Sequence, residues 1–104
     1  MVGRKPADDW PHFTYTARLQ FWSLPARAIE SFAVVFPEFT RHPLRPSESL
    51  DVCPIRNDRA RWRLKVEGYR AIYQIHHGRP VIEDILPRTP GTYRDLWVRR
   101  RRVG

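Results

Sequence analysis

The sequence has a single cysteine, Cys53, among its 104 residues. One cysteine excludes an internal disulfide and any zinc site built from several cysteines, and it fits a reducing compartment. Long apolar runs are also missing, because no stretch approaches the roughly 18 residues that a membrane-spanning helix needs. The first residues, MVGRKPADDWPHF, lack the apolar stretch of a secretory signal. We therefore expect a cytoplasmic protein that contacts no membrane.

Negative charge is scarce in the second half of the chain. Residues 1–52 contain six Lys or Arg and six Asp or Glu, so their formal charges cancel. Residues 53–104 contain thirteen Lys or Arg and five Asp or Glu, which supplies the whole net charge of +8. All but one of these cations are arginine, whose planar fork binds phosphate oxygens in pairs. The charge favours a polyanion or an acidic protein as partner; the alternative is a surface charge that only keeps the protein soluble.

Side-chain groups typical of metal or carboxylate catalysis are missing too. His76 and His77 adjoin Gly78 in an expected exposed turn, and no second cluster has metal-ligand spacing, so we expect neither a metal nor another cofactor. Glu83 and Asp84 are adjacent in an expected strand, where neighbouring side chains point to opposite faces. A pair of catalytic carboxylates is therefore not expected there.

The remaining composition suits one compact domain. Hydrophobic residues make up 41% of the chain, which is enough to build one core, and the length is too short for two. We expect residues 1–12 to be an irregular leader and residues 97–104 a basic tail. The whole of residues 1–104 is therefore interpreted as a single domain.

Apolar periodicity predicts the elements of the first half. FTYTARLQF alternates over residues 13–21, which predicts a half-buried strand. Ser23 can cap a helix whose apolar residues recur over residues 24–36, and Pro37 is expected to end it. The following residues are rich in Pro, Ser and charge. They predict a long connection, with a short helical turn near residues 47–52.

The period of two returns in RWRLKVEGYR, residues 61–70. Glu67-Gly68 predicts a two-residue hairpin turn, and in that register Lys65 lies directly opposite Arg70. A third strand is expected in VIEDIL, residues 81–86. The order of elements predicts an α+β fold, with an antiparallel sheet of about four strands and one or two N-terminal helices on one face.

The polar face of this hairpin gathers cations. Like charges directly opposite each other destabilise a pair of strands by about 0.2–1 kcal/mol, and a phosphate chain would reverse that sign. The sequence therefore predicts a face that binds RNA phosphates, with an ordinary solvated sheet face as the alternative. The residues expected to bind phosphate are Arg61, Arg63, Lys65 and Arg70.

Residues 61–96 resemble the carboxyl-terminal half of the RelE/ParE toxin superfamily. The shared features are a basic strand, a Gly-Tyr-Arg hairpin that leads into IYQI, an arginine after a further strand, and a tyrosine a few residues later. The resemblance implies a RelE-like toxin that forms a hetero-oligomer with an acidic antitoxin. In the ribosome-dependent members, mRNA on the ribosome is cut without a metal. The 2′-hydroxyl attacks the adjacent phosphate and leaves a cyclic phosphate.

The resemblance also implies roles for individual residues. Arg70 matches the family's phosphate-binding arginine, and Arg88 matches the arginine proposed to help the leaving group. Tyr93 falls near the catalytic tyrosine, one residue closer to Arg88, and needs neighbouring cations to lower its ordinary pKa of about 10. Arg61 and Arg63 stand where the RelE branch has two lysines. Arginine can hold a phosphate, but it is a poor proton shuttle.

Other interpretations stay open at this point. Tyr93 could be a packed aromatic residue that closes the core, and Arg88 could pair with Asp84 or Asp95. The ParE branch of the superfamily acts on DNA gyrase and lacks a nucleolytic site, so a gyrase-binding toxin is a second candidate. A third is a degenerate member that only binds RNA through its basic face.

Overall fold

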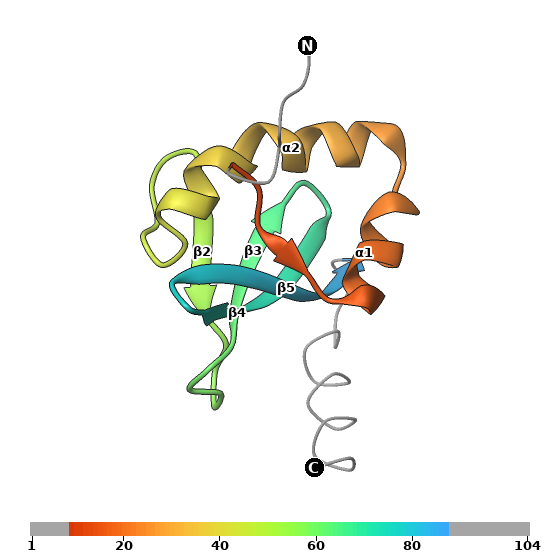
Figure 1. Cartoon of the computed structure of the whole chain (residues 1–104). Helices are drawn as coiled ribbons and strands as arrows, with labels where there is room; N and C mark the ends of the chain where they lie inside the picture. The colour runs from red at the N-terminus through yellow and green to blue at the C-terminus, as the bar shows by residue number, and fades with distance from the viewer. Residues whose placement is uncertain (1–8, 88–104) are drawn as a thin grey trace.

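The computed structural model describes residues 9–87, which form two helices and one five-stranded sheet (Figure 1). The strand order is β1-β5-β4-β3-β2; β1 is parallel to β5, and the other neighbours are antiparallel. The α+β class is confirmed, although the sheet is mixed and has five strands. The elements are β1 His12–Phe13, α1 Tyr15–Trp22, α2 Ala26–Arg41, β2 Asp51–Pro54, β3 Trp62–Val66, β4 Tyr69–His76 and β5 Arg79–Pro87.

Helix α2 lies across one face of the sheet and supplies three of the thirteen buried residues of the main core cluster (Figure 1). Its buried Phe32, Phe36 and Phe39 belong to the same apolar cluster as Leu64 of β3 and Tyr73 of β4. The opposite face of the sheet carries a second, smaller cluster and most of the charged side chains of the hairpin. That smaller cluster consists of Ile55, Ile72 and Leu86.

Residues 15–22 form helix α1, so the prediction of a strand over residues 13–21 is wrong. Thr14 is the N-cap of α1, and its Oγ1 accepts a hydrogen bond from the amide of Ala17 at 3.1 Å. Only Ala17 and Phe21 of α1 are buried. These two residues are four apart, a spacing that puts them on one face of a strand and also on one side of a helix. The alternation of apolar residues therefore did not distinguish a strand from a helix. Packing against β5 decided it.

The boundaries of the second helix also differ from prediction. Ser23 ends α1, where its Oγ donates to the carbonyl of Leu19 at 2.8 Å, instead of capping α2. Pro25 is the N-cap of α2, and Pro37 lies inside that helix instead of ending it. Proline removes one helical hydrogen bond. Phe39, beyond Pro37, is fully buried with its ring edge-on to Tyr73 at 4.7 Å, and this burial favours continuing the helix.

The connection after α2 contains a strand that the sequence did not predict. Ser47 and Leu50 form a tight turn with two backbone hydrogen bonds of 3.0 and 3.2 Å, where a helical turn was expected. Strand β2 follows and pairs with β3, so that Asp51 lies opposite Lys65. Glu38 of α2 accepts hydrogen bonds from the hydroxyls of Ser47 and Ser49 at 2.8 and 2.7 Å. Asp51 begins β2 directly after this turn. These contacts fix the start of β2.

The hairpin of β3 and β4 has the predicted register. Val66 pairs with Tyr69, and Lys65 pairs with Arg70. Glu67 takes a positive φ of 55° in the turn. The expected third strand is also confirmed as β5, which is two residues longer at its start and one at its end than predicted. Among residues 9–87, no helix is long and apolar enough to span a membrane.

Candidate nucleic-acid interface

Rows of paired residues cross the sheet on the face opposite α2. Directly paired residues of antiparallel strands point to the same face, so each row gathers four side chains from four strands. Charged and apolar groups share these rows, and carboxylates lie among the cations. One row is Asp51, Lys65, Arg70 and Leu86, and the next is Cys53, Arg63, Ile72 and Asp84.

Asp51 neutralises two of the cations expected to bind phosphate. Its Oδ1 accepts a hydrogen bond from Nη1 of Arg63 at 2.9 Å, and its Oδ2 lies 3.8 Å from Nζ of Lys65. The hydrogen bond from Arg63 holds the pKa of the Asp51 carboxyl below its usual range, helped by the positive charges of Lys65 and Arg70. The like-charge repulsion predicted between Lys65 and Arg70 is therefore offset from inside the protein.

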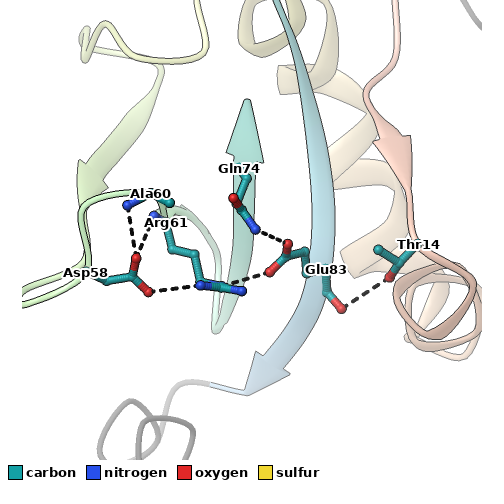
Figure 2. A network of polar contacts seen from close by, with 6 residues as sticks. All are labelled: Thr14, Asp58, Ala60, Arg61, Gln74 and Glu83. Carbon is teal, nitrogen blue, oxygen red and sulfur yellow. Dashed lines mark hydrogen bonds and ion pairs between the residues drawn. The ribbon is translucent and has the colours of Figure 1, made fainter. Parts of the chain in front are cut away.

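Arg61 is held between two carboxylates (Figure 2). Its Nε donates to Glu83 at 2.9 Å, and its Nη1 donates to Asp58 at 3.3 Å. Partial burial by itself lowers the pKa of the Arg61 guanidinium, but the two carboxylates outweigh that effect and raise it. A phosphate that approaches Arg61 thus meets two negative charges beside one positive charge.

A β-bulge brings Glu83 to the charged face of the sheet. Ile72 pairs with Asp84 and Tyr73 pairs with Ile82, so Glu83 is the extra residue of β5. Ile82 and Ile85 both point into the core, which leaves the two acidic residues between them on the other face. The expectation that Glu83 and Asp84 point to opposite faces is therefore wrong, because it assumed an unbroken alternation.

The same network links the charged face to α1. Nε2 of Gln74 on β4 donates to the second carboxylate oxygen of Glu83, and the hydroxyl of Thr14 donates to the backbone oxygen of Glu83 at 3.3 Å (Figure 2). Oδ1 of Asp58 accepts the amides of Ala60 and Arg61 at 3.0 Å each, which fixes the loop before β3. Arg61 therefore acts as a structural tie between that loop and β5.

Arg70 differs from the other three cations of the face. It is 7% exposed, and within residues 9–87 no carboxylate lies at ion-pair distance from it. Its Nη1 donates to the carbonyl of Tyr69 at 3.3 Å. A buried guanidinium has five donors to satisfy, and removing its charge from water without an anion is costly. Among residues 9–87, Arg70 is therefore the cation of this face that has no carboxylate at contact distance, and Asp51 acts on it only from farther away.

Arg88 and Tyr93 lie outside the described residues, so their predicted roles stay predictions. The same holds for the predicted basic tail. The sequence places much of the charge there: residues 9–87 contain eleven Lys or Arg and nine Asp or Glu, whereas residues 88–104 contain six Arg and one Asp. Within residues 9–87, no three His, Cys, Asp or Glu are grouped closely enough to hold a metal ion.

The sequence carries a sign of the bulge that brings Glu83 and Asp84 to the charged face, although we did not predict that bulge. VIEDIL places two polar residues between two apolar pairs, which breaks the period of two and is typical of a bulge. No comparable signal pointed to Asp51 or Asp58. These residues come near Arg63 and Arg61 through strand pairing and loop closure, which local sequence does not encode.

Comparison with protein-family models gives no match, and comparison with the curated proteins gives none. Solved structures do match. A RelB–RelE antitoxin–toxin complex from Methanococcus jannaschii superposes with a TM-score of 0.63 at 14% identity, over 83% of this chain and 94% of that chain. An archaeal RelE–RelB complex from Pyrococcus horikoshii also gives 0.63, at 20% identity, over 79% of this chain and 98% of that chain.

A toxin–antitoxin complex of the RelBE type from Mycobacterium tuberculosis is 28% identical, with a TM-score of 0.53, over 75% of this chain and 99% of that chain. The alignments thus span nearly the full length of each matched chain. The chain has a RelE-like toxin fold, which confirms the resemblance predicted from residues 61–96.

Proposed function

We propose that this protein is the toxin of a toxin–antitoxin pair and that it cuts mRNA on the ribosome without a metal. Arg70 carries the proposal. It is a buried cation on the face opposite α2, no carboxylate of residues 9–87 lies at ion-pair distance from it, and it follows the Gly-Tyr pair that the resemblance singles out. A phosphodiester would supply the anion that this guanidinium lacks.

In the proposed reaction, the 2′-hydroxyl of one nucleotide loses its proton and attacks the adjacent phosphorus. The bond from phosphorus to the 5′-oxygen of the next nucleotide breaks, so the products are a 2′,3′-cyclic phosphate and a 5′-hydroxyl. Arg70 stabilises the negative charge that builds on the phosphate. Tyr93, as its phenolate, takes the proton as general base, Arg88 stabilises the negative charge on the departing 5′-oxygen, and that oxygen takes its proton from solvent.

Three cations of the face are less available to bind phosphate than Arg70, namely Arg61, Arg63 and Lys65. Asp51 and Glu83 compete with RNA for them, since a carboxylate and a phosphate use the same guanidinium donors. We propose that Arg63 and Lys65, whose shared partner Asp51 is half exposed, contact the RNA backbone outside the reacting phosphate. Arg61 contributes to the same interface by holding the loop before β3 in place against β5.

The partner proposed for regulation is an acidic antitoxin. Two observations support it: the net charge of +8, and the fact that each of the three similar structures is a complex of RelE with RelB or of the RelBE type. An acidic partner would neutralise the positive charge of the chain. The resulting hetero-oligomer would keep the toxin inactive in the cytoplasm.

Expression of the chain in a bacterial host tests the proposal. We expect translation to stop and mRNA to accumulate breaks with 5′-hydroxyl ends, and we expect co-expression of a small acidic antitoxin, sought in the open reading frames beside this gene, to restore growth. Arg70→Gln should abolish the breaks, whereas Arg45→Gln, with the same change of charge at an exposed loop residue, should not. Harmless expression of the intact chain would refute the proposal for that host.

A gyrase-binding toxin is the second candidate. The observation that favours it is the pairing of Arg61 and Arg63 with carboxylates, at the positions where the RelE branch has lysines. Tyr93→Phe separates the two functions, because a general base is needed for cleavage and not for binding a protein. Persistent toxicity in Tyr93→Phe, with DNA breaks or lost supercoiling and intact mRNA, would favour gyrase. Salt-sensitive RNA binding without any cleavage would instead indicate the degenerate RNA-binding member.

A further inference from the structure

The outer side of α1 is an exposed apolar stripe. Tyr15, Leu19 and Trp22 are 72%, 53% and 59% exposed, although each is a large apolar side chain. They recur at a spacing of four and three residues, so they line one side of the two-turn helix. Neighbouring exposed apolar residues of this kind mark interaction sites more often than single ones do. We call these three residues with Arg18 the α1 stripe.

The stripe lies outside the buried core, although the ring of Trp22 stacks on Trp10 at 6.4 Å and meets the core residue Phe21 edge-on at 4.9 Å. Ala17 and Phe21 are the residues of α1 that pack inward, and Gln20 anchors the helix by accepting the amide of Ile85 at 2.7 Å. Thr14 fixes the other end of the helix as its N-cap. The helix is therefore held in place by its inner side, and its outer side is free to present a rigid surface to a partner.

The charge on the stripe indicates which partner fits. Arg18 is exposed and lies one turn from both Tyr15 and Trp22 on the same side of the helix, and α1 contains no carboxylate. In a twofold contact between two copies of α1, Arg18 would lie near its own copy, and the like charges would repel each other. A segment with apolar residues on one side and a carboxylate beside them would satisfy both the stripe and Arg18.

We propose that the α1 stripe is the docking surface for an amphipathic, acidic helix of the antitoxin. The inference rests on the proposed function, and it assigns the partner to a surface distinct from the charged sheet face around Arg70. Residues of α1 three and four apart form ridges, and a partner helix packs its own side chains between them. A carboxylate of the partner pairs with Arg18 at the middle of the contact.

The test uses the full chain and a purified acidic antitoxin, identified as the small protein whose co-expression restores growth. Affinity is measured by calorimetry for the wild type, for Leu19→Arg, and for the matched control Val34→Arg at an exposed apolar residue of α2. Leu19→Arg should weaken the complex at least about tenfold, as expected for a buried apolar contact, and Val34→Arg should not. Circular dichroism and thermal melting check that each variant folds.

A second pair of variants tests the charge. Arg18→Glu and Arg45→Glu lower the net charge of the chain equally. Arg45→Glu reports how much the lower net charge alone weakens binding to the acidic partner, and Arg18→Glu should weaken binding by more than that. Equal affinities in each matched pair would overturn the inference, while binding by the wild type would preserve the antitoxin part of the proposed function. Failure of the wild type to bind would overturn both, and growth arrest on expression would show whether the chain is still a toxin.

Two further measurements test whether a second copy of the chain or a membrane surface binds the α1 stripe instead. Sedimentation velocity of the chain alone reports self-association, and a dimer that Leu19→Arg dissociates would assign the stripe to a second copy. Flotation with vesicles of phosphatidylcholine and phosphatidylglycerol reports lipid binding, and its loss in Leu19→Arg but not in Val34→Arg would assign the stripe to a membrane surface. Either result would overturn the proposal of a protein helix.

Discussion

Glu83 and Arg61 are joined across strand β4 by a hydrogen-bonded ion pair of 2.9 Å. The pair exists because a bulge in β5 brings the carboxylate onto the charged face of the sheet. It changes the interpretation of Arg61 from a phosphate ligand to a residue that ties the sheet to the loop before β3. Arg70, in contrast, has no carboxylate at ion-pair distance within residues 9–87.

Arg61→Met and Arg70→Met should have opposite consequences for stability. Arg61→Met leaves Asp58 and Glu83 without their shared cation, so we expect the free energy of unfolding to fall by about 1–3 kcal/mol. Arg70→Met removes a buried charge and nearly keeps the side-chain volume, so the free energy of unfolding should stay the same or rise. Urea denaturation measures both. A similar large loss in the two variants would contradict the distinction between a structural and a ligand-binding arginine.

Glu83→Gln should increase RNA affinity while it weakens the fold. Losing the negative charge frees Arg61 for anions, so binding of a short labelled single-stranded RNA at low salt should tighten a few-fold. The free energy of unfolding should fall by about 1–2 kcal/mol, because a partly buried charged hydrogen bond is lost. Glu48→Gln makes the same change of charge at an exposed loop residue. If the two variants bind RNA equally, Glu83 does not compete with RNA.

Asp51→Asn should reveal a contribution to stability that depends on pH. Because the folded state lowers the pKa of Asp51, the ionised form is stabilised above its ordinary pKa of about 4. That stability is lost as the pH falls through the lowered folded value. The wild type should therefore exceed Asp51→Asn by less than about 1 kcal/mol at neutral pH, since the pair is half exposed, and the gap should close in acid.

Denaturation at several pH values measures this gap, and a second background checks its cause. In Arg63→Gln, the main donor to Asp51 is missing, so the effect of Asp51→Asn at neutral pH should shrink. An undiminished effect in that background would show that Arg63 is not the origin of the lowered pKa.

Thr14→Ala should destabilise the protein by about 1 kcal/mol. The substitution removes the N-cap of α1 and the hydrogen bond from Thr14 to the backbone of Glu83. Thr16→Ala is the matched control, since Thr16 is exposed within the same helix. Thermal unfolding compares the two variants. Equal midpoints would mean that the cap does not determine where α1 forms.

Much of the second half of the fold could be predicted from local pattern. The alternation in residues 61–70 and the Glu67-Gly68 turn determine which residues of β3 and β4 pair, because a slip by one residue would turn every apolar side chain to the wrong face. The same residues carry the resemblance to RelE toxins. The charge of residues 53–104 and the position of Arg70 on the polar face were also determined by sequence alone.

Tertiary structure decided the rest, because these features depend on contacts between distant segments. Residues 13–21 fit a strand and a helix equally well, and only the packing of Ala17 and Phe21 selected α1. Strand β2 acquired its identity by pairing with β3, and the bulge at Glu83 brought a carboxylate to Arg61. The sequence thus determined where the cations lie. The folded chain decided which of them are neutralised, since charge balance depends on which side chains the fold brings within a few ångströms of each other.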